Sequence, residues 1–359
     1  MTYYINREPS LSYDDLLIVP QLPDPSDELI YTRTTLDTSS YFFGHRLELP
    51  IVNAPMDTIA SHYMLLALTQ SGVMGCSHRF QDSLSQTLDL YTTLKSLTTT
   101  TGPVPPIVAT IGADEKDYIN RIDVITQALE GVTTDIPKIW LVDIANGYSP
   151  VIERPIQYLR NRFGSSIRII AGNICTIAGF QYLADLGVDA VRCGIGSGSV
   201  CSTRRHTGVG YGQATVISDI AQARSMLNLD HVKIIADGGI GRGADFCKAL
   251  ALGADLVMIG RMFAGTNECP KQHKNTYRGM ASKEVMEDHG ITGKMAEGVE
   301  VKVKSQGGAW KVLDYLGQSL RSSMSYVNAH NLEEFRDRAI LRRVTNNTYI
   351  EGLTKGDKE

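Results

Sequence analysis

Eight short apolar runs, each ending in glycine or a polar residue, recur along this 359-residue chain. They occupy residues 48–55, 72–78, 106–112, 138–146, 167–173, 190–196, 233–239 and 255–260. Helix-like stretches lie between several of them, at residues 63–71, 155–163, 178–187, 215–227 and 243–253. Near-continuous apolar strands are typical of a parallel sheet buried on both faces. Eight strand–helix units predict an α/β fold, a (β/α)8 TIM barrel, although strand pattern alone does not exclude an open doubly wound sheet.

The C-terminal third of the chain departs from this pattern. Residues 266–311 are polar and contain glycine, which favours a mobile flap over core. Residues 312–343 have a helical pattern and are expected to pack on the barrel. Since no repeat or linker marks a boundary, we expect residues 1–359 to form a single barrel domain.

Composition excludes several classes of protein. The net charge of −4 gives no electrostatic case for nucleic acid, and no apolar run approaches the length that spans a bilayer. The N-terminus lacks the apolar core of a signal peptide. Six cysteines form no CxxC pair, which favours reduced thiols. We therefore expect a cytoplasmic protein that binds neither nucleic acid nor membrane.

Polar residues collect where the predicted strands end, which in such a barrel is the site of chemistry. They are Asp57, His78, Asp143, Asn146, Asn173 and Asp237. The loop GIGSGSVCSTRRHTGVGYGQ (194–213) follows the sixth strand and is expected at the same mouth. Its single thiol, Cys201, precedes polar and basic residues, and positive neighbours favour the nucleophilic thiolate. The alternative, a small buried hydrophobe, suits most cysteines.

Glycine-rich loops also follow the seventh and eighth strands, at 236–243 and 259–265. Loops in these positions often bind phosphate, so a phosphorylated nucleoside is the expected ligand. Asp237 is a candidate acceptor for ribose hydroxyls, and a turn-capping aspartate is the alternative. Glu297 lies in a polar segment, where most glutamates are simply solvated. His78 and Arg79 fit either a structural role or a cofactor contact.

Several motifs together resemble the family of inosine monophosphate dehydrogenase and guanosine monophosphate reductase. They are LSYDDLLIVP (11–20), PIVNAPMDT (50–58), AGNI (171–174), GIGSGSVCSTR (194–204), IIADGGI (234–240), YRGM (277–280) and LRSSMSYV (320–327). Two further segments, LVDIANGYS (141–149) and TRRHTGVGY (203–211), are similar to the reductase versions. The chain leaves no room for a CBS-type regulatory domain after the second strand. It also lacks the Arg-Tyr pair with which dehydrogenases activate water.

The resemblance therefore implies a guanosine monophosphate reductase, an NADPH-dependent oxidoreductase of purine salvage that forms homotetramers. It implies a catalytic set of Cys201 as nucleophile with Thr203 and Glu297 as proton-transfer pair. The implied nucleotide-binding residues are Ser199, Asp237, Gly238, Gly239, Gly260, Arg261, Tyr277, Gly279, Met280, Ala281 and Gly298. The implied cofactor-binding residues are Arg79, Asp143, Ile144, Ala145, Ile195 and Gly196. A potassium ion is implied at Gly196, Gly198 and Cys201, with Arg204 beside it.

The chain departs from the family pattern at a few positions. Arg261 replaces a small residue beside the phosphate, Ala281 a serine, Gly212 a proline and Arg79 the lysine of reductases. The segment LRSSMSY (320–326) is closer to dehydrogenases. The alternatives are a dehydrogenase without the regulatory domain, a reductase acting on a deoxy or modified purine nucleotide, and a nucleotide-binding protein without catalysis.

Overall fold

The central feature of the computed structural model is a sheet of eight parallel strands. The structure describes residues 8–24, 26–30, 32–97, 105–130, 132, 138–273 and 275–354. The strands are β4 (Ile51–Asn53), β5 (Gly75–Cys76), β6 (Ile107–Ile111), β7 (Ile139–Asp143), β8 (Arg168–Ile174), β9 (Ala190–Cys193), β10 (Lys233–Asp237) and β11 (Leu256–Ile259). They are ordered β4-β11-β10-β9-β8-β7-β6-β5. A parallel bridge between Val52 and Met74 closes the sheet. The predicted (β/α)8 barrel is confirmed.

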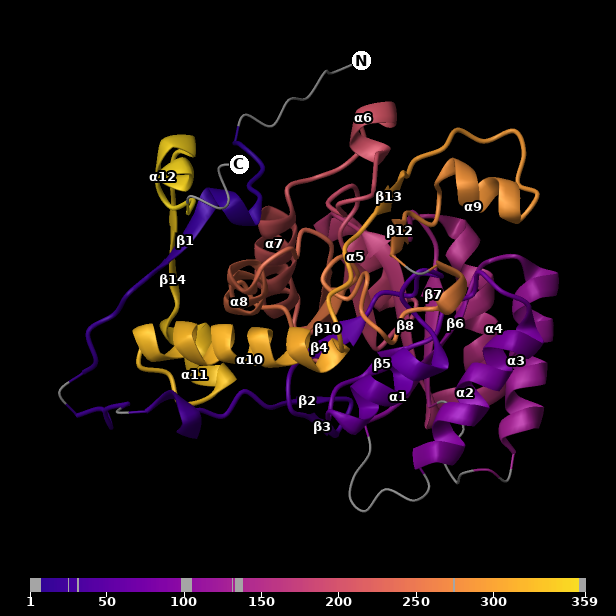
Figure 1. The fold of residues 1–359 in the computed structure, drawn as a ribbon, viewed down its shortest axis with the longest axis horizontal. Coiled ribbons are helices and arrows are strands. Elements are labelled where there is room, and N and C mark those ends of the chain that lie inside the picture. The colour runs from indigo at the N-terminus through magenta and orange to yellow at the C-terminus, as the bar shows by residue number, and fades with distance from the viewer. Residues whose placement is uncertain are drawn as a thin grey trace.

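Eight helices follow these strands and surround the barrel (Figure 1). They are α1 (His62–Gln70), α2 (Ser83–Leu97), α3 (Glu115–Leu129), α4 (Glu153–Phe163), α5 (Ile177–Asp185), α7 (Gln213–Met226), α8 (Gly243–Ala251) and α10 (Ala309–Tyr326). Several begin at a side chain that accepts from a backbone amide of the first turn: Ser61 for α1, Asp114 for α3 and Thr176 for α5. Such caps satisfy amides that have no partner within the helix.

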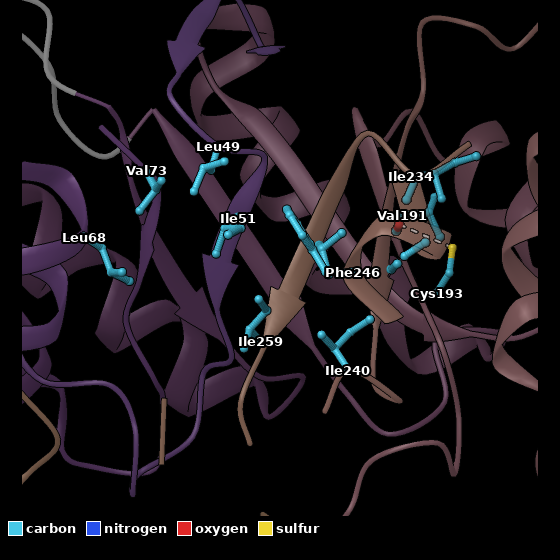
Figure 2. Packing of buried hydrophobic residues seen from close by; sticks show 14 of the residues in the cluster. Leu49, Ile51, Leu68, Val73, Val191, Cys193, Ile234, Ile240, Phe246 and Ile259 are labelled. Atoms are coloured by element: carbon cyan, nitrogen blue, oxygen red, sulfur yellow. Dashed lines mark hydrogen bonds between the residues drawn. The ribbon is translucent and has the colours of Figure 1, made fainter. Parts of the chain in front are cut away.

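Alternate strand residues contribute to two separate apolar layers, as the pleat of a strand requires. On β11, Leu256 and Met258 belong to the cluster inside the barrel, whereas Val257 and Ile259 belong to the larger cluster beneath the helices. Figure 2 shows part of this outer layer, in which Phe246 of α8 lies among side chains of the sheet. The strands are therefore buried on both faces, which explains why they read as continuous apolar runs.

A short hairpin contributes to the inner layer. Its strands are β2 (Ser40–Phe42) and β3 (His45–Leu47), which pair antiparallel. Phe42 and Leu47 are buried in the cluster that contains Ile139, Ala190 and Leu256, the first or second residues of their strands. The hairpin therefore covers the amino-terminal end of the barrel, opposite the end at which chemistry is expected.

The segment predicted as a flap, 266–311, forms an excursion between β11 and α10. Its two ends meet where Thr266 bridges Gly307, and we call residues 266–307 the excursion. It contains η5 (Lys271–His273), β12 (Thr276–Arg278), α9 (Lys283–Asp288) and β13 (Glu300–Lys302), with β12 and β13 antiparallel. Residues 309–311 instead begin α10. Lys274 of the predicted flap, like residues 1–7 and 355–359 of the predicted domain, lies outside the described residues.

The buried guanidinium of Arg278 fastens this excursion to the barrel. It forms ion pairs with Asp57 after β4 at 2.5 Å, with Asp288 at the end of α9 at 2.8 Å, and with Glu300 on β13 at 3.7 Å. Burial tends to lower the pKa of Arg278, but the Asp57 and Asp288 carboxylates raise it above its ordinary value. The excursion therefore carries an internal charge cluster that ties it to the loop after the first barrel strand.

The helical prediction for residues 312–343 is wrong at its end. Helix α10 ends at Tyr326, α11 (Leu332–Arg338) follows, and residues 340–343 form β14 (Ile340–Arg343). Strand β14 pairs antiparallel with β1 (Leu16–Val19), some 320 residues earlier in the chain, beside α12 (Asn346–Glu351) (Figure 1). A strand that depends on so distant a partner has no local signal. No helix in the described ranges combines the length and apolarity that crossing a bilayer requires.

Candidate active site

A cavity of about 1170 Å³ opens at the carboxyl ends of the barrel strands. Nearly all of the site residues predicted from sequence line it: Arg79, Asp143, Ile144, Ala145, Ile195, Gly196, Gly198, Ser199, Cys201, Thr203, Arg204, Asp237, Gly238, Gly239, Gly260, Arg261, Tyr277, Gly279, Met280, Ala281 and Glu297. Gly298 is not part of the lining, although its backbone bridges Cys201. A cavity of this size is large enough for a small-molecule or cofactor ligand.

The thiol of Cys201 faces a hydroxyl at the rim of this cavity. Its Sγ lies 3.2 Å from Oγ1 of Thr203, the first residue of the short helix α6 (Thr203–Thr207). The Cys201 amide donates to the Gly198 carbonyl at 3.0 Å, which turns the chain sharply. We call residues 194–202 the cysteine loop. Its turn presents the thiol and the hydroxyl to the same space.

Cys201 differs from the other five cysteines. Cys76, Cys193, Cys247 and Cys269 are buried, and Cys175 is half-buried. Burial raises the pKa of all five thiols. They therefore remain protonated and serve as small apolar groups. Cys201 is also half-buried, but it is the one cysteine of the six that lines the cavity, so it has the accessibility expected of a reactive thiol.

Backbone hydrogen bonds bring Glu297 to the cysteine loop across 96 positions of sequence. The Ser202 amide donates to the Glu297 carbonyl at 2.8 Å, and the Val299 amide donates to the Val200 carbonyl at 3.0 Å. The Glu297 amide in turn donates to the Ala281 carbonyl at 2.9 Å. Residues 297–299 thus form a short ladder with the cysteine loop. Cys201, Thr203 and Glu297 are brought together although the last comes from the excursion.

Arg204 supports the loop and does not contact the thiol. Its guanidinium donates to the Tyr211 carbonyl. A Cβ on Gly196 or on Gly210 would lie 2.6 Å from Arg204 Cγ, and both glycines have positive φ. Only a residue without a side chain leaves space for the arginine stem at these positions. The two glycines are therefore explained by the path of Arg204 as well as by turning.

Five charged or polar side chains that line the cavity form a network. Arg192 Nε donates to Asp237 Oδ2 at 2.9 Å, and its NH1 group donates to Asp143 Oδ1. Asn173 Nδ2 donates to the same Asp237 oxygen at 2.7 Å, and Arg79 Nε donates to Asp143 Oδ2 at 3.3 Å. Burial alone would lower the pKa of Arg192, but the Asp237 and Asp143 carboxylates raise it above its ordinary value. One oxygen of Asp237 is thus held firmly, which fixes the direction of the other.

Sequence reasoning did not identify Arg192 as a site residue. It stands at the third position of β9, and its side chain is only 11% exposed. A charged residue inside an otherwise apolar strand was the available signal, because a buried cation requires a carboxylate partner. Its partners on β7 and β10 are 49 and 45 residues away, so the sequence alone does not reveal the pairing.

Another part of the cavity lining has the character of an anion site. A Cβ on Gly260 would lie 2.8 Å from the Tyr277 hydroxyl, so that hydroxyl is set against the glycine backbone. Burial raises the pKa of Tyr277 to about 12, despite the Ser199 hydroxyl and the positive charge of Arg261. The tyrosine hydroxyl is therefore a hydrogen-bond donor at neutral pH. Arg261, Ser199 and Tyr277 together offer a cation and two hydroxyls to an anion.

Comparison with known proteins agrees with this geometry. Residues 10–354 match the model of the IMP dehydrogenase / GMP reductase domain. The chain is 33% identical over 319 residues to the GMP reductase of Oenococcus oeni, covering 87% of this chain and 92% of the relative. It is 32% identical over 360 residues to the GMP reductase of Onchocerca volvulus, covering 96% and 93%. Both shares exceed four fifths, so the similarity extends over the barrel, the cysteine loop and the excursion. The chain belongs to the IMP dehydrogenase / GMP reductase family.

Proposed function

We propose that the protein is a GMP reductase, an oxidoreductase that converts guanosine monophosphate to inosine monophosphate at the cost of NADPH. Guanosine monophosphate, NADPH and one proton give inosine monophosphate, NADP⁺ and ammonia. The observation that carries the proposal is the convergence of Cys201, Thr203 and Glu297 at one cavity, with Sγ and Oγ1 3.2 Å apart. The names of the curated relatives support the same reaction.

Cys201 supplies the nucleophile for carbon 2 of the purine. The C2–S bond forms, the amine at C2 takes a proton and leaves as ammonia, and a thioimidate remains on the enzyme. Thr203 lies beside the sulfur, and backbone hydrogen bonds hold Glu297 against Ser202. This pair serves as the proton relay for the departing amine. Positioned proton transfer lets the poor leaving group depart at neutral pH.

The second half of the reaction takes place beside Asp143, Ile144, Ala145, Ile195 and Gly196, which all line the cavity. The nicotinamide cofactor, when bound, supplies the hydride that C2 receives. The C2–S bond then breaks, its electron pair goes to the sulfur, and Cys201 is restored as a free thiolate while the product forms. Arg79 borders this side, where its ion pair with Asp143 at 3.3 Å holds it ready for a polar group of the cofactor.

The nucleotide is held at its two polar ends. The free oxygen of Asp237 accepts from ribose hydroxyls, while Gly238 and Gly239 supply backbone amides. Ser199, Gly260, Arg261 and Tyr277 surround the phosphate, and Gly279, Met280 and Ala281 border the base, while Gly298 bridges Cys201 from outside the lining. The positive charge and neutral hydroxyls of the phosphate end fit a dianionic monophosphate.

We propose that a potassium ion binds at the cysteine loop. The backbone carbonyls of Gly196, Gly198 and Cys201 would be its ligands, since carbonyl oxygens are donors that suit potassium. Arg204 braces the turn of this loop between Gly196 and Gly210. Bound potassium would hold the turn that presents the thiol. We also propose a homotetramer that acts in the cytoplasm as a single domain without a CBS-type regulatory domain. Light scattering coupled to gel filtration tests the tetramer.

One assay separates this function from its alternatives. The enzyme is supplied with guanosine, deoxyguanosine or inosine monophosphate, each with NADPH or NAD⁺, and nicotinamide absorbance and ammonia are followed. A reductase oxidises NADPH with guanosine monophosphate and releases one ammonia per turnover. A dehydrogenase instead reduces NAD⁺ with inosine monophosphate, a binding protein does neither, and a shifted specificity appears as faster turnover of the deoxynucleotide. Omitting potassium tests the ion in the same assay.

A further inference from the structure

His206, which the proposed reaction leaves without a role, joins the excursion to helix α6. It is the fourth residue of α6, the helix that Thr203 begins, and it stands five positions after Cys201. Its Nδ1 lies 3.0 Å from the carbonyl oxygen of Ala296 and 3.1 Å from Oγ of Ser202. Ala296 immediately precedes Glu297, and Ser202 immediately follows Cys201. One imidazole nitrogen therefore contacts both the segment that contains Cys201 and the segment that contains Glu297.

The contact with Ala296 fixes where the imidazole carries its proton. A carbonyl oxygen only accepts hydrogen bonds, so an unprotonated Nδ1 would bring two acceptors to 3.0 Å of each other. Nδ1 therefore bears the hydrogen and donates a hydrogen bond to the Ala296 carbonyl. The Ser202 hydroxyl, 3.1 Å from Nδ1, contacts the same nitrogen. Both the imidazolium and the neutral Nδ1–H tautomer satisfy the arrangement. The hold on Ala296 thus does not require His206 to be charged.

This side-chain contact adds to the backbone contact beside it. The Ser202 amide donates to the Glu297 carbonyl at 2.8 Å, and the His206 amide donates to the Ser202 carbonyl at 3.0 Å. The two successive carbonyls of Ala296 and Glu297 are therefore both held by residues that flank Thr203. Backbone hydrogen bonds hold residues 289–291 to the end of α9 and the Glu297 amide to the Ala281 carbonyl. Between them, no backbone–backbone hydrogen bond involves residues 292–296, so the His206 contact is what fixes the approach to Glu297 within this described stretch.

We propose that His206 is a positioning residue, whose Nδ1–H holds the Ala296 carbonyl and so places the Glu297 carboxyl beside Thr203 for proton transfer. The effect of His206 on turnover rests on the proposed function, whereas its hydrogen bond to Ala296 of the excursion does not. His206 itself touches no reacting atom. It sets the orientation of a neighbouring residue whose misplacement by even 1 Å is enough to slow chemistry.

Two amide variants distinguish this role from a general need for a polar side chain. Asparagine carries its amide nitrogen on Cγ, where histidine carries Nδ1, whereas glutamine carries it one carbon further out. His206→Asn therefore keeps the donor in place, while His206→Gln and His206→Ala remove it. Arg205→Ala is the matched control, because Arg205 is exposed on the same helix and lines no part of the cavity.

The first measurement is hydrogen–deuterium exchange of peptides that cover residues 289–297, with the unliganded full-length protein. We expect faster exchange in His206→Ala and His206→Gln, and exchange as in wild type in His206→Asn and Arg205→Ala. Unchanged exchange in His206→Ala would overturn the proposed hold. Because no substrate is involved, this result stands whether or not the protein reduces guanosine monophosphate.

The second measurement is the kcat and KM of each variant with guanosine monophosphate and NADPH. Loss of one hydrogen bond is expected to lower kcat by about three- to tenfold in His206→Ala and His206→Gln, with KM for the nucleotide little changed. His206→Asn is expected to recover most of kcat. Equal kcat in wild type and His206→Ala, or a glutamine variant as active as the asparagine variant, contradicts positioning. If wild type itself has no activity, the proposed function fails and the exchange result alone decides the hold.

Discussion

Replacing Arg192 by methionine tests the charge network in the lining of the cavity. Methionine keeps much of the length and apolar volume of the arginine stem but removes the guanidinium that pairs with Asp143 and Asp237. Removing one partner of a buried ion pair costs about 3–5 kcal/mol, because the remaining charges stay desolvated. The two carboxylates are 13% and 17% exposed, so we expect the lower value, about 3 kcal/mol.

The variant is also expected to lose affinity for the nucleotide. Asp237 Oδ2 would keep its hydrogen bond from Asn173 but lose the one from Arg192. The carboxylate would then rotate more freely, and Oδ1 would form weaker hydrogen bonds with the ribose hydroxyls. We expect kcat/KM for guanosine monophosphate to fall by about tenfold. Urea denaturation of the unliganded protein gives the stability change, and initial rates give the second quantity.

Arg168→Met is the matched control. Arg168 pairs with Asp189 at 2.8 Å, but its side chain is 51% exposed, and exposed pairs contribute less than about 1 kcal/mol. An Arg192→Met protein that is as stable as Arg168→Met and binds the nucleotide normally would refute the reasoning. Arg192→Lys is expected to lie between them, since an ammonium group has no fork with which to bridge two carboxylates.

Three further predictions concern single side chains. Thr203→Val removes the hydroxyl that lies 3.2 Å from the Cys201 sulfur. It is expected to lower kcat by about a hundredfold while NADPH still binds. A kcat near that of wild type would exclude Thr203 from proton transfer. Arg261→Gly removes the cation beside Tyr277. It is expected to raise KM for the nucleotide about fivefold at low salt and less at high salt. An unchanged KM argues against a phosphate contact. Burial lowers the pKa of His78 from 6.5 to about 4. Between pH 6.5 and pH 4 this histidine is therefore protonated in the unfolded chain but neutral in the native protein. Acidification across that window is therefore expected to cost about 3 kcal/mol of unfolding free energy, and His78→Gln is expected to flatten this pH dependence in denaturation titrations.

Much of the fold could be predicted from sequence because its strands are buried on both faces. Runs such as PIVATIG and KIIADGG have no polar alternation, so each is recognisable alone, and each lies where a barrel strand is found. Strand β14 could not be predicted, since Ile340–Arg343 is short, half polar and defined by its pairing with β1. Its partner is remote in sequence, and no local propensity encodes that distance.

The candidate site divides in a similar way. Residues 194–213 stand out because glycines, a thiol and basic residues occur within 20 positions. Glu297 has no local signal of its own, and only the family resemblance singled it out before its backbone contacts with Ser202 and Ala281 were known. Arg192 and His206 were missed for the same physical reason. Each acts through partners on other segments, Asp143 and Asp237 for the first and Ala296 for the second.

Mass spectrometry of the enzyme mixed with guanosine monophosphate and no cofactor tests the central claim most directly. The account predicts a purine nucleotide attached to the peptide that contains Cys201, formed with release of ammonia, and absent in Cys201→Ala. It also predicts that adding NADPH discharges the adduct as inosine monophosphate. Turnover of guanosine monophosphate by Cys201→Ala, or an adduct on any of the other five cysteines, would contradict it.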